Sequence, residues 1–299
     1  MRGWRKRVCA NVGFLLARPA RSVCANGWFY ISGISVSAST VSNLNEKAFE
    51  AVGAWRSHPL ERAYPYVYVD GIYLKCSWGG SYENVAVMVT IGVNDDGYRE
   101  VIGAAEGFTE SAECWRELLS WLKSRGLRGV RMFAGDKAAG MVGSIAEVFP
   151  EAAYHRCTVH FYRNVLARVP KTRRARVSAM LKAVHAMESH EEAEAKALEV
   201  ASELEGLKLK EAAKAVLEGY AETLTYTRFP REHWRRIRTN NAAERLNREI
   251  CRRTRVVGTF PDGKSALMLV TARPMYVAES EWGVAPLPGR DAAGSVAAP

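Results

Sequence analysis

The sequence predicts an α/β protein with a mixed sheet, helices on the faces of that sheet, and a separate all-helical block. Three strand-like segments joined by tight turns come first, and strands that alternate with helices follow, in the order β-β-β-α-β-α-β. Residues 160–229 then show helical periodicity with no strand pattern. A chain of 299 residues with 48% hydrophobic content can bury a large core around such a sheet.

The first predicted strand, residues 64–75, is a run of aromatic and β-branched residues with Asp70 at its centre. Such a run is typical of a strand that is buried on both faces of a sheet. An unpaired carboxylate there costs several kcal/mol, so Asp70 must be neutral, pair with a cation or bind a metal. Gly71 would let another group approach the backbone closely. The simpler alternative is that Asp70 forms a salt bridge with an arginine or caps a neighbouring turn.

A hairpin follows this strand. Residues 83–93 alternate Val and Ile with smaller residues, which predicts a second strand. Residues 94–97 read Asn-Asp-Asp-Gly, a strong turn signal, and residues 98–105 return as a third strand.

Helices and strands then alternate. Apolar residues at helical spacing predict a helix at 110–125, and a short strand at 130–136 ends in Asp136. A helix at 137–149 and a strand at 153–157 complete the sheet. Three strands joined by tight turns, followed by strands joined through helices, give a mixed sheet.

The all-helical block follows, and its charged stretch from 191 to 214 is most simply a solvated helix face. Beyond it we predict a helix capped near Asn240 or Asn241 and a last short helix at 264–276. This last part of the chain would return to the sheet after the helical insertion.

The N-terminal region divides into two parts. Residues 1–29 show neither helical nor alternating periodicity, which predicts an unstructured arm. From Ile31 a turn, a Ser or Thr cap and a helix to about Arg56 follow, as in the second half of a helix-turn-helix, although an ordinary capped surface helix fits equally well. We expect five regions: an arm with a partial helix-turn-helix, a first core segment, a helical insertion, a second core segment and a disordered tail, at residues 1–60, 61–160, 161–230, 231–278 and 279–299.

Composition narrows the class of partner. The net charge of +10 and the pI of about 9.4 indicate a polyanionic partner, nucleic acid before membrane. The six cysteines are scattered without a CxxC pair, which fits free thiols in a reducing compartment. The apolar run at residues 8–17 is too short to span a bilayer, and no convincing cleavage site follows it. We therefore expect a cytoplasmic protein.

Three carboxylates form the candidate catalytic and metal-binding set: Asp70, Asp136 and Glu244. If the first and fourth strands are neighbours, Asp70 and Asp136 meet at one edge, and a helix packed across that edge would supply Glu244. Carboxylates gathered this closely repel one another unless divalent cations lie between them, and hard oxygen ligands suit Mg²⁺ or Mn²⁺. Two such ions about 3.5 to 4 Å apart would clamp the oxygens of a phosphoryl displacement. The pattern therefore points to cutting or joining a phosphodiester.

Each carboxylate has an alternative role. Asp136 could cap the next helix, and Asn241 with Glu244 forms a fair capping box. Glu249 is a rival for the third ligand, but it faces a different side of its helix, nearer Arg252.

Basic and aromatic residues are interleaved along the second half of the chain, a composition that suits phosphate contacts and base stacking. The DNA-binding candidates are Arg163, Arg235, Arg236, Arg245, Arg248, Arg252 and Arg253. Some of them would only cover solvated helix faces. Cys157 and His160, with His155 nearby, invite a zinc site, but a structural cysteine and histidine beside the active edge is the stronger interpretation.

Four motifs carry a resemblance to a known family. They read Val-Asp-Gly-Ile-Tyr around Asp70, Gly-Asp-Lys around Asp136, Arg-Cys-Thr-Val-His-Phe-Tyr-Arg-Asn at 156–164, and Thr-Asn-Asn-Ala-Ala-Glu-Arg-Leu-Asn-Arg-Glu-Ile at 239–250. Together they resemble the bacterial Mutator-type (IS256 family) transposases over about residues 30–282, and the last motif is highly specific.

The resemblance implies an RNase H-like fold interrupted by a helical insertion, and a DDE triad at Asp70, Asp136 and Glu244. It also implies that Cys157 and His160 fill the Cys-x-x-His signature of the family. A protein of this kind nicks and transfers element ends that bear terminal inverted repeats, using Mg²⁺ or Mn²⁺. Its expected partners are double-stranded DNA and further copies of itself, in the bacterial nucleoid.

The chain departs from the family at both ends. Family members usually carry a longer N-terminal DNA-binding region, and the residues after 276 stray from the pattern into a Pro- and Ala-rich tail. This predicts a copy that is truncated at its N- and C-termini. Two alternatives to a transposase core are a catalytically silent DNA-binding remnant and an RNase H-like nuclease without transposition activity.

Overall fold

The computed structural model describes residues 28–31, 34–78, 81–107, 111–257 and 263–278. Its centre is a five-stranded mixed sheet with the order β5-β4-β3-β6-β7. The strands are β3 (Tyr66–Trp78), β4 (Ser81–Val93), β5 (Arg99–Gly107), β6 (Met132–Gly135) and β7 (Ala153–Arg156). Strands β3, β4 and β5 pair antiparallel, whereas β6 and β7 run parallel to β3. The expected α/β class and the order of elements along the chain, β-β-β-α-β-α-β, are therefore confirmed.

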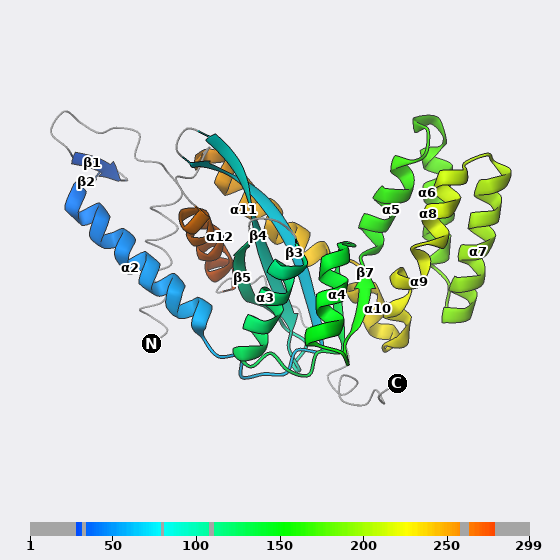
Figure 1. Ribbon diagram of the computed structural model, residues 1–299, viewed down its shortest axis with the longest axis horizontal. Coiled ribbons are helices and arrows are strands. Elements are labelled where there is room, and N and C mark those ends of the chain that lie inside the picture. Colours follow the sequence, from blue (N-terminus) through cyan, green and yellow to red (C-terminus); the bar gives the residue numbers. More distant parts are fainter. Residues whose placement is uncertain (1–27, 32–33, 79–80, 108–110, 258–262, 279–299) are drawn as a thin grey trace.

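Helices cover both faces of this sheet (Figure 1). One face packs against α3 (Ala112–Ser124) and α4 (Ala139–Val148). The other face packs against α10 (Arg231–Ile237), α11 (Asn241–Val257) and α12 (Gly263–Ala278). Side chains of β3 alternate between the two cores, with Val67 and Val69 in the first and Tyr66 and Tyr68 in the second. Asp70 falls on the same face of the strand as Tyr68, the face that α11 covers.

Strand β3 anchors the second layer through its tyrosine hydroxyls. Tyr66 Oη lies 2.8 Å from His233 Nδ1, and Tyr68 Oη donates to the Arg236 carbonyl at 3.0 Å. Both tyrosines are buried, so each hydroxyl needs such a partner. These bonds fix α10, and with it the start of α11, against the centre of the sheet.

The helical block extends from β7 and is helical throughout its described length, as the sequence predicts. It contains α5 (Thr158–Ala167), η1 (Lys171–Arg173), α6 (Arg174–Val184), α7 (His190–Gly206), α8 (Lys210–Leu217), α9 (Tyr220–Thr223) and η2 (Thr225–Arg228). Its core is continuous with the core beneath the sheet. Figure 1 shows the block as an arm at one end of the molecule, beyond β7.

The two ends of this block meet at one backbone carbonyl. Arg238 O accepts from the Thr158 backbone N–H at 3.2 Å, from Thr158 Oγ1 at 3.0 Å and from His155 Nε2 at 3.0 Å. The Arg238 side chain reaches back into the block and donates to His185 O at 2.8 Å. The chain therefore leaves and rejoins the sheet at the same place.

The N-terminal helix α2 (Ala38–Ser57) is capped by Ser37, whose Oγ accepts from Thr40 N at 3.1 Å. This confirms the predicted helix and its serine cap. The described residues ahead of it are not a helix but two antiparallel strands, β1 (Trp28–Ile31) and β2 (Ile34–Ser37). Their aromatic and β-branched residues favour a strand, which differs from the first helix that a helix-turn-helix needs.

The expected arm and tail lie outside the described residues, apart from the start of β1. In the part of the chain that the structure describes, no helix combines the length and apolar character that a membrane span requires.

Candidate functional site

Asp70 lies in the middle of β3, and its carboxylate has two nearby donors. The backbone N–H of Gly71 donates to Oδ1 at 3.1 Å, and Asn247 Nδ2 donates to Oδ2 at 2.7 Å. Burial raises the pKa of Asp70 to about 6, although His160, Gly71 and Asn247 each favour the charged form, and the negative charge of Glu244 adds to the rise. The alternative in which Asp70 pairs with an arginine is not what the structure shows.

Asp136 follows β6 directly. Strand β6 runs parallel to β3, and Ala134 lies opposite Tyr68. Asp70 follows Tyr68 by two residues and Asp136 follows Ala134 by two residues, so the two aspartates occupy equivalent positions on neighbouring strands. Its Oδ1 accepts from the backbone N–H of Lys137 at 2.7 Å, and its side chain is more than half exposed. The next helix has Ala138 at its N-cap with no side-chain bond, so Asp136 does not serve as the cap of α4.

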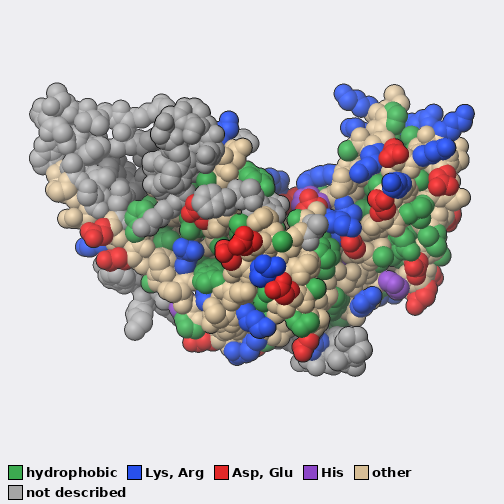
Figure 2. Space-filling model, in the orientation of Figure 1, with side chains coloured by type: hydrophobic (Ala, Val, Ile, Leu, Met, Phe, Trp, Pro, Cys, Tyr) green, Lys and Arg blue, Asp and Glu red, His purple; other side chains and the backbone are tan. Residues whose placement is uncertain are grey.

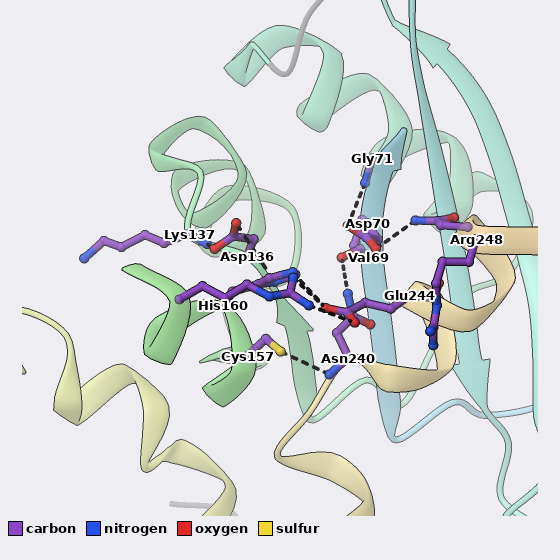
Figure 3. Close-up of polar contacts among 12 residues, drawn as sticks. Val69, Asp70, Gly71, Asp136, Lys137, Cys157, His160, Asn240, Glu244 and Arg248 are labelled. Carbon is purple, nitrogen blue, oxygen red and sulfur yellow. Dashed lines mark hydrogen bonds and ion pairs between the residues drawn. The ribbon is translucent and has the colours of Figure 1, made fainter. Parts of the chain in front are cut away.

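Glu244 lies in the first turn of α11, which packs across β3. Its Oε1 lies 3.0 Å from His160 Nε2 and 3.1 Å from Arg163 Nη1, and Arg163 Nη2 donates to Oε2 at 3.4 Å. Figure 3 shows the carboxylate pointing toward α5 rather than back to the start of its own helix, where a capping box would place it. The side chain is only 18% exposed, so these cations offset the cost of its burial.

His160 lies between the carboxylates. Its Nε2 contacts Glu244, and its Nδ1 is 4.0 Å from Asp136 Oδ2. The pKa of His160 is raised to about 9, first by a hydrogen bond to the Cys157 side chain and then, against the opposing effect of burial, by negative charge at Cys157, Asp136 and Asp70. The imidazole is therefore positively charged at neutral pH, with Glu244 in contact and Asp136 nearby.

Cys157 has a structural role in this arrangement. It is fully buried, and its Sγ accepts from the backbone N–H of Asn240 at 3.2 Å. Asn240 also donates from its side chain to Val69 O at 3.3 Å, next to Asp70. Cys157 and Asn240 thus tie the start of α5 and the start of α11 to β3.

Asp136 and Glu244 both lie next to His160, and Asp70 is close enough to His160 and Glu244 for their charges to shift its pKa. Among the described residues, no group of three or more His, Cys, Asp and Glu side chains is arranged to hold a metal ion. Glu244 is held instead by His160 and Arg163. The oxygen donors suit Mg²⁺ or Mn²⁺, but in this conformation a cation would have to compete with His160 and Arg163 for the third ligand. The rival Glu249 lies away from the site, paired with Arg252 at 2.8 Å.

Sequence reasoning missed Asn247 and Asn240. Asn247 is three residues after Glu244, a spacing that places two side chains on the same face of a helix, and this signal could have found it. The amide oxygens of both asparagines are buried without a hydrogen-bond partner among the described residues. Both asparagines therefore belong to the immediate surroundings of Asp70.

The predicted DNA-binding arginines differ in their environments. Those with exposed positions are Arg163, Arg235, Arg245, Arg248 and Arg252. Arg236 is half-buried, and the side chain of Arg253 lies outside the described residues. The exposed members on α11 line the side of the helix opposite its buried stripe of Ala243, Leu246 and Ile250.

The comparisons with known proteins agree with this picture. A family model described as "Transposase, Mutator family" matches residues 29–283. The transposase of insertion sequence element ISRM5 from Rhizobium meliloti is 35% identical over 81% of this chain and 61% of its own length. The transposase of IS1081 from Mycobacterium tuberculosis is 36% identical over 79% of this chain and 57% of its own length. The transposase of IS256 in transposon Tn4001 from Staphylococcus aureus is 32% identical over 84% of this chain and 65% of its own length.

The chain thus spans about 60% of the length of the curated relatives at the head of this comparison. The matched region contains the whole five-stranded sheet, the helical block and all three carboxylates. On the strength of a family match that covers most of its residues, the chain belongs to the Mutator family of transposases.

Proposed function

We propose that this chain is the catalytic core of a DNA transposase, which nicks the ends of an insertion sequence and transfers them to target DNA. The observation that carries the proposal is the convergence of Asp70, Asp136 and Glu244, from three separate elements, at one edge of the sheet. Membership of the Mutator family supports the same reaction. The net charge of +10 suits a DNA partner.

We also propose that the fold is RNase H-like. An antiparallel β3-β4-β5 unit extended by parallel β6 and β7, with helices on both faces, supports this assignment. The acidic residues then occupy the central strand, the end of its parallel neighbour, and a helix packed across the central strand and β4. The helical block enters after β7 and ends before α11, which leaves this arrangement intact.

Asp70, Asp136 and Glu244 are the proposed ligands for Mg²⁺ or Mn²⁺. Divalent ions bound there would activate the attacking oxygen and stabilise the leaving oxygen of a phosphodiester. The raised pKa of Asp70, about 6, still leaves most of this carboxyl ionised at neutral pH. Gly71 and Asn247 orient the Asp70 carboxylate, because each donates a hydrogen bond to one of its oxygens.

The surrounding cations have a complementary role. His160 and Arg163 balance the charge of Glu244 in the absence of DNA. Arg163 is 62% exposed, so a DNA phosphate can compete with Glu244 for its guanidinium. DNA binding and the availability of Glu244 would then be linked.

A second candidate function is DNA binding without cleavage. The pairing of Glu244 with two cations and the lack of a ready-made metal group among the described residues favour it. In that case the chain would bind duplex DNA in a salt-sensitive manner and would not cut it.

The test is nicking of a labelled duplex that carries the inverted repeat found next to the gene, with Mg²⁺ or Mn²⁺ as the only divalent ion. We expect cleavage that is abolished by Asp70→Asn, Asp136→Asn and Glu244→Gln. Glu249→Gln is the matched control, because it removes a carboxylate from the same helix on a different side, and it should retain activity. Full cleavage by any of the three variants would remove that residue from the catalytic set, and binding without cleavage by the unsubstituted chain would support the second candidate.

A further inference from the structure

The first helices of the block form a basic surface, of which the catalytic proposal uses only Arg163. Between Glu151 and Glu188 the sequence contains no Asp or Glu, while arginines and lysines recur throughout. Helix α5, η1 and the start of α6 occupy this segment. A run of this length with charge of one sign on folded helices creates a local positive potential.

Exposed positive charges recur along α5 and into η1. Arg163 contacts Glu244 at the site, and Arg168 and Lys171 lie farther along the chain, at the end of α5 and in η1. All three are exposed, and so is Asn164 between them. Arg168 Nη1 donates to Asn164 O at 2.7 Å, so its side chain folds back along the helix toward Arg163. We call Arg163, Arg168 and Lys171 the α5 stripe.

The opposite half of the block is acidic. Glutamates are frequent along α7, and Lys196 and Lys214 each lie near a glutamate a few residues along the chain. Lys196 Nζ lies 2.7 Å from Glu199 and Lys214 Nζ lies 3.8 Å from Glu218. Figure 2 shows this polarity: Lys and Arg side chains gather at the upper end of the arm, and acidic side chains gather at its lower end.

Figure 2 also shows a hollow beside the arm, with acidic and histidine side chains visible near its base. The α5 stripe begins at Arg163, which contacts Glu244, and continues along the chain into η1. Helix α5 is about 15 Å long, close to half a turn of duplex DNA at about 34 Å per turn. A phosphate backbone that follows the helix would meet Arg163, Arg168 and Lys171 in succession.

We infer that the α5 stripe binds the phosphate backbone of duplex DNA and guides it to the edge that carries Glu244. The inference rests on the proposed function, which makes the edge that carries Glu244 the catalytic one. Duplex DNA is chosen as the ligand because its negative charge complements the positive charge of the stripe. Because the contacts are to phosphates, binding here is independent of base sequence. The helical block is then a DNA-binding arm as well as an insertion.

The experiment uses the full chain with EDTA present, so that binding is measured without cutting. A fluorescent duplex of random sequence, about 30 base pairs long and without an inverted repeat, is titrated over a range of salt concentrations. The test variant is Arg168→Gln with Lys171→Gln, which spares Arg163 at the site. The matched control is Lys196→Gln with Lys214→Gln, which removes the same charge from the acidic half.

We expect the stripe variant to bind about tenfold more weakly and its salt slope to fall by about two, while the control matches the unsubstituted chain. Four outcomes would each overturn the inference. Both variants could lose the same affinity for duplex DNA, or the stripe variant could lose none. The loss of affinity could be confined to single-stranded DNA or RNA, or the unsubstituted chain could fail to bind duplex DNA. Thermal melting establishes that both variants are folded, and a third variant, Lys171→Glu, should weaken binding even if the double variant is unstable.

The nicking assay separates this inference from the catalytic proposal. Stripe-dependent binding without metal-dependent nicking would remove the catalytic proposal and leave the arm as a DNA-binding surface. Metal-dependent nicking together with DNA binding that does not depend on the stripe would support the catalytic proposal and remove the inference about the α5 stripe.

Discussion

Asn247 donates its side-chain N–H to Asp70 Oδ2 at 2.7 Å, from a position three residues after Glu244 on the same helix. One face of α11 therefore supplies a carboxylate to the site and also holds a second carboxylate in place. If the helix shifted, both acidic groups would be displaced together. This coupling makes Asn247 a positioning residue for the proposed reaction.

Asn247→Ala should lower the nicking rate by about ten- to a hundredfold, because Asp70 loses the donor that orients it. The variant should also need a higher Mn²⁺ concentration for half-maximal cleavage, which a loss of stability alone would not cause. Asn241→Ala, an exposed asparagine on the same helix, is the control and should leave both values unchanged. An unaltered Mn²⁺ requirement in Asn247→Ala would rule out the positioning role.

Two glycines of α4 should respond in opposite directions to alanine. A Cβ at Gly140 would lie 2.7 Å from the backbone nitrogen of Ala112, where α3 and α4 pack together, whereas a Cβ at Gly143 meets nothing within 4 Å. We expect Gly140→Ala to lower the free energy of unfolding by about 1–3 kcal/mol and Gly143→Ala to raise it by about 0.5–1 kcal/mol. Urea denaturation measures both changes, and a stabilised Gly140→Ala would mean that α3 and α4 are not closely packed.

Buried histidines should make the protein sensitive to acid. Burial lowers the pKa of His155 and of His185 to about 4, while both would titrate near 6.5 in the unfolded chain. Because the unfolded state binds these protons more readily, the stability that the neutral histidines provide is complete above pH 6.5 and is lost as the pH falls toward 4. His185 alone accounts for up to about 3 kcal/mol of this loss.

His185→Gln should therefore flatten the dependence of the unfolding free energy on pH between 6.5 and 4. Gln retains a donor and an acceptor for Tyr162 Oη and Thr223 Oγ1, which contact the ring nitrogens of His185. The exposed His58 serves as the control through His58→Gln, whose profile should follow the unsubstituted chain. Identical profiles for both variants would exclude His185 as a source of the acid sensitivity.

A zinc chelator should leave the melting temperature unchanged. The Cys157 sulfur accepts from Asn240 N, and no cluster of zinc ligands occurs in the portion of the chain that the structure describes. Removing a structural zinc would instead cost much of the folding energy. A clear drop in melting temperature on chelation, or zinc that copurifies in a stoichiometric amount, would contradict the structural role of Cys157.

The sheet could be predicted from the sequence because its strands have a strong local pattern. The alternation of Val67, Tyr68 and Val69 and the Asn-Asp-Asp-Gly turn after Val93 depend only on neighbouring residues. The predicted strand at 64–75 begins two residues early, since Pro65 precedes the first paired residue, and ends three residues short of Trp78. The sequence predicted a mixed sheet, and the parallel pairing of β3 with β6 is a finding of the structure.

The candidate site was predictable only in part. Asp70 and Asp136 could be placed together, because each stands at a defined point on a strand. The contacts of Glu244 with His160 and Arg163 could not, because they depend on how α11 packs against α5, more than eighty residues earlier. The pairing of β1 with β2 was missed because each strand is only four residues long, too short to show a clear alternating pattern. The RNase H-like assignment and the metal remain predictions.

The convergence of three donors on Arg238 O has a consequence for how this architecture can change. The segment from Thr158 to Arg238 begins and ends at the same hydrogen-bonded junction. The length of this segment therefore does not set the distances between Glu244 and the two aspartates. The helices between α5 and α10 could therefore be shortened, enlarged or exchanged, provided that the junction at Arg238 O and the contacts of α5 and α10 with the site and the sheet are kept.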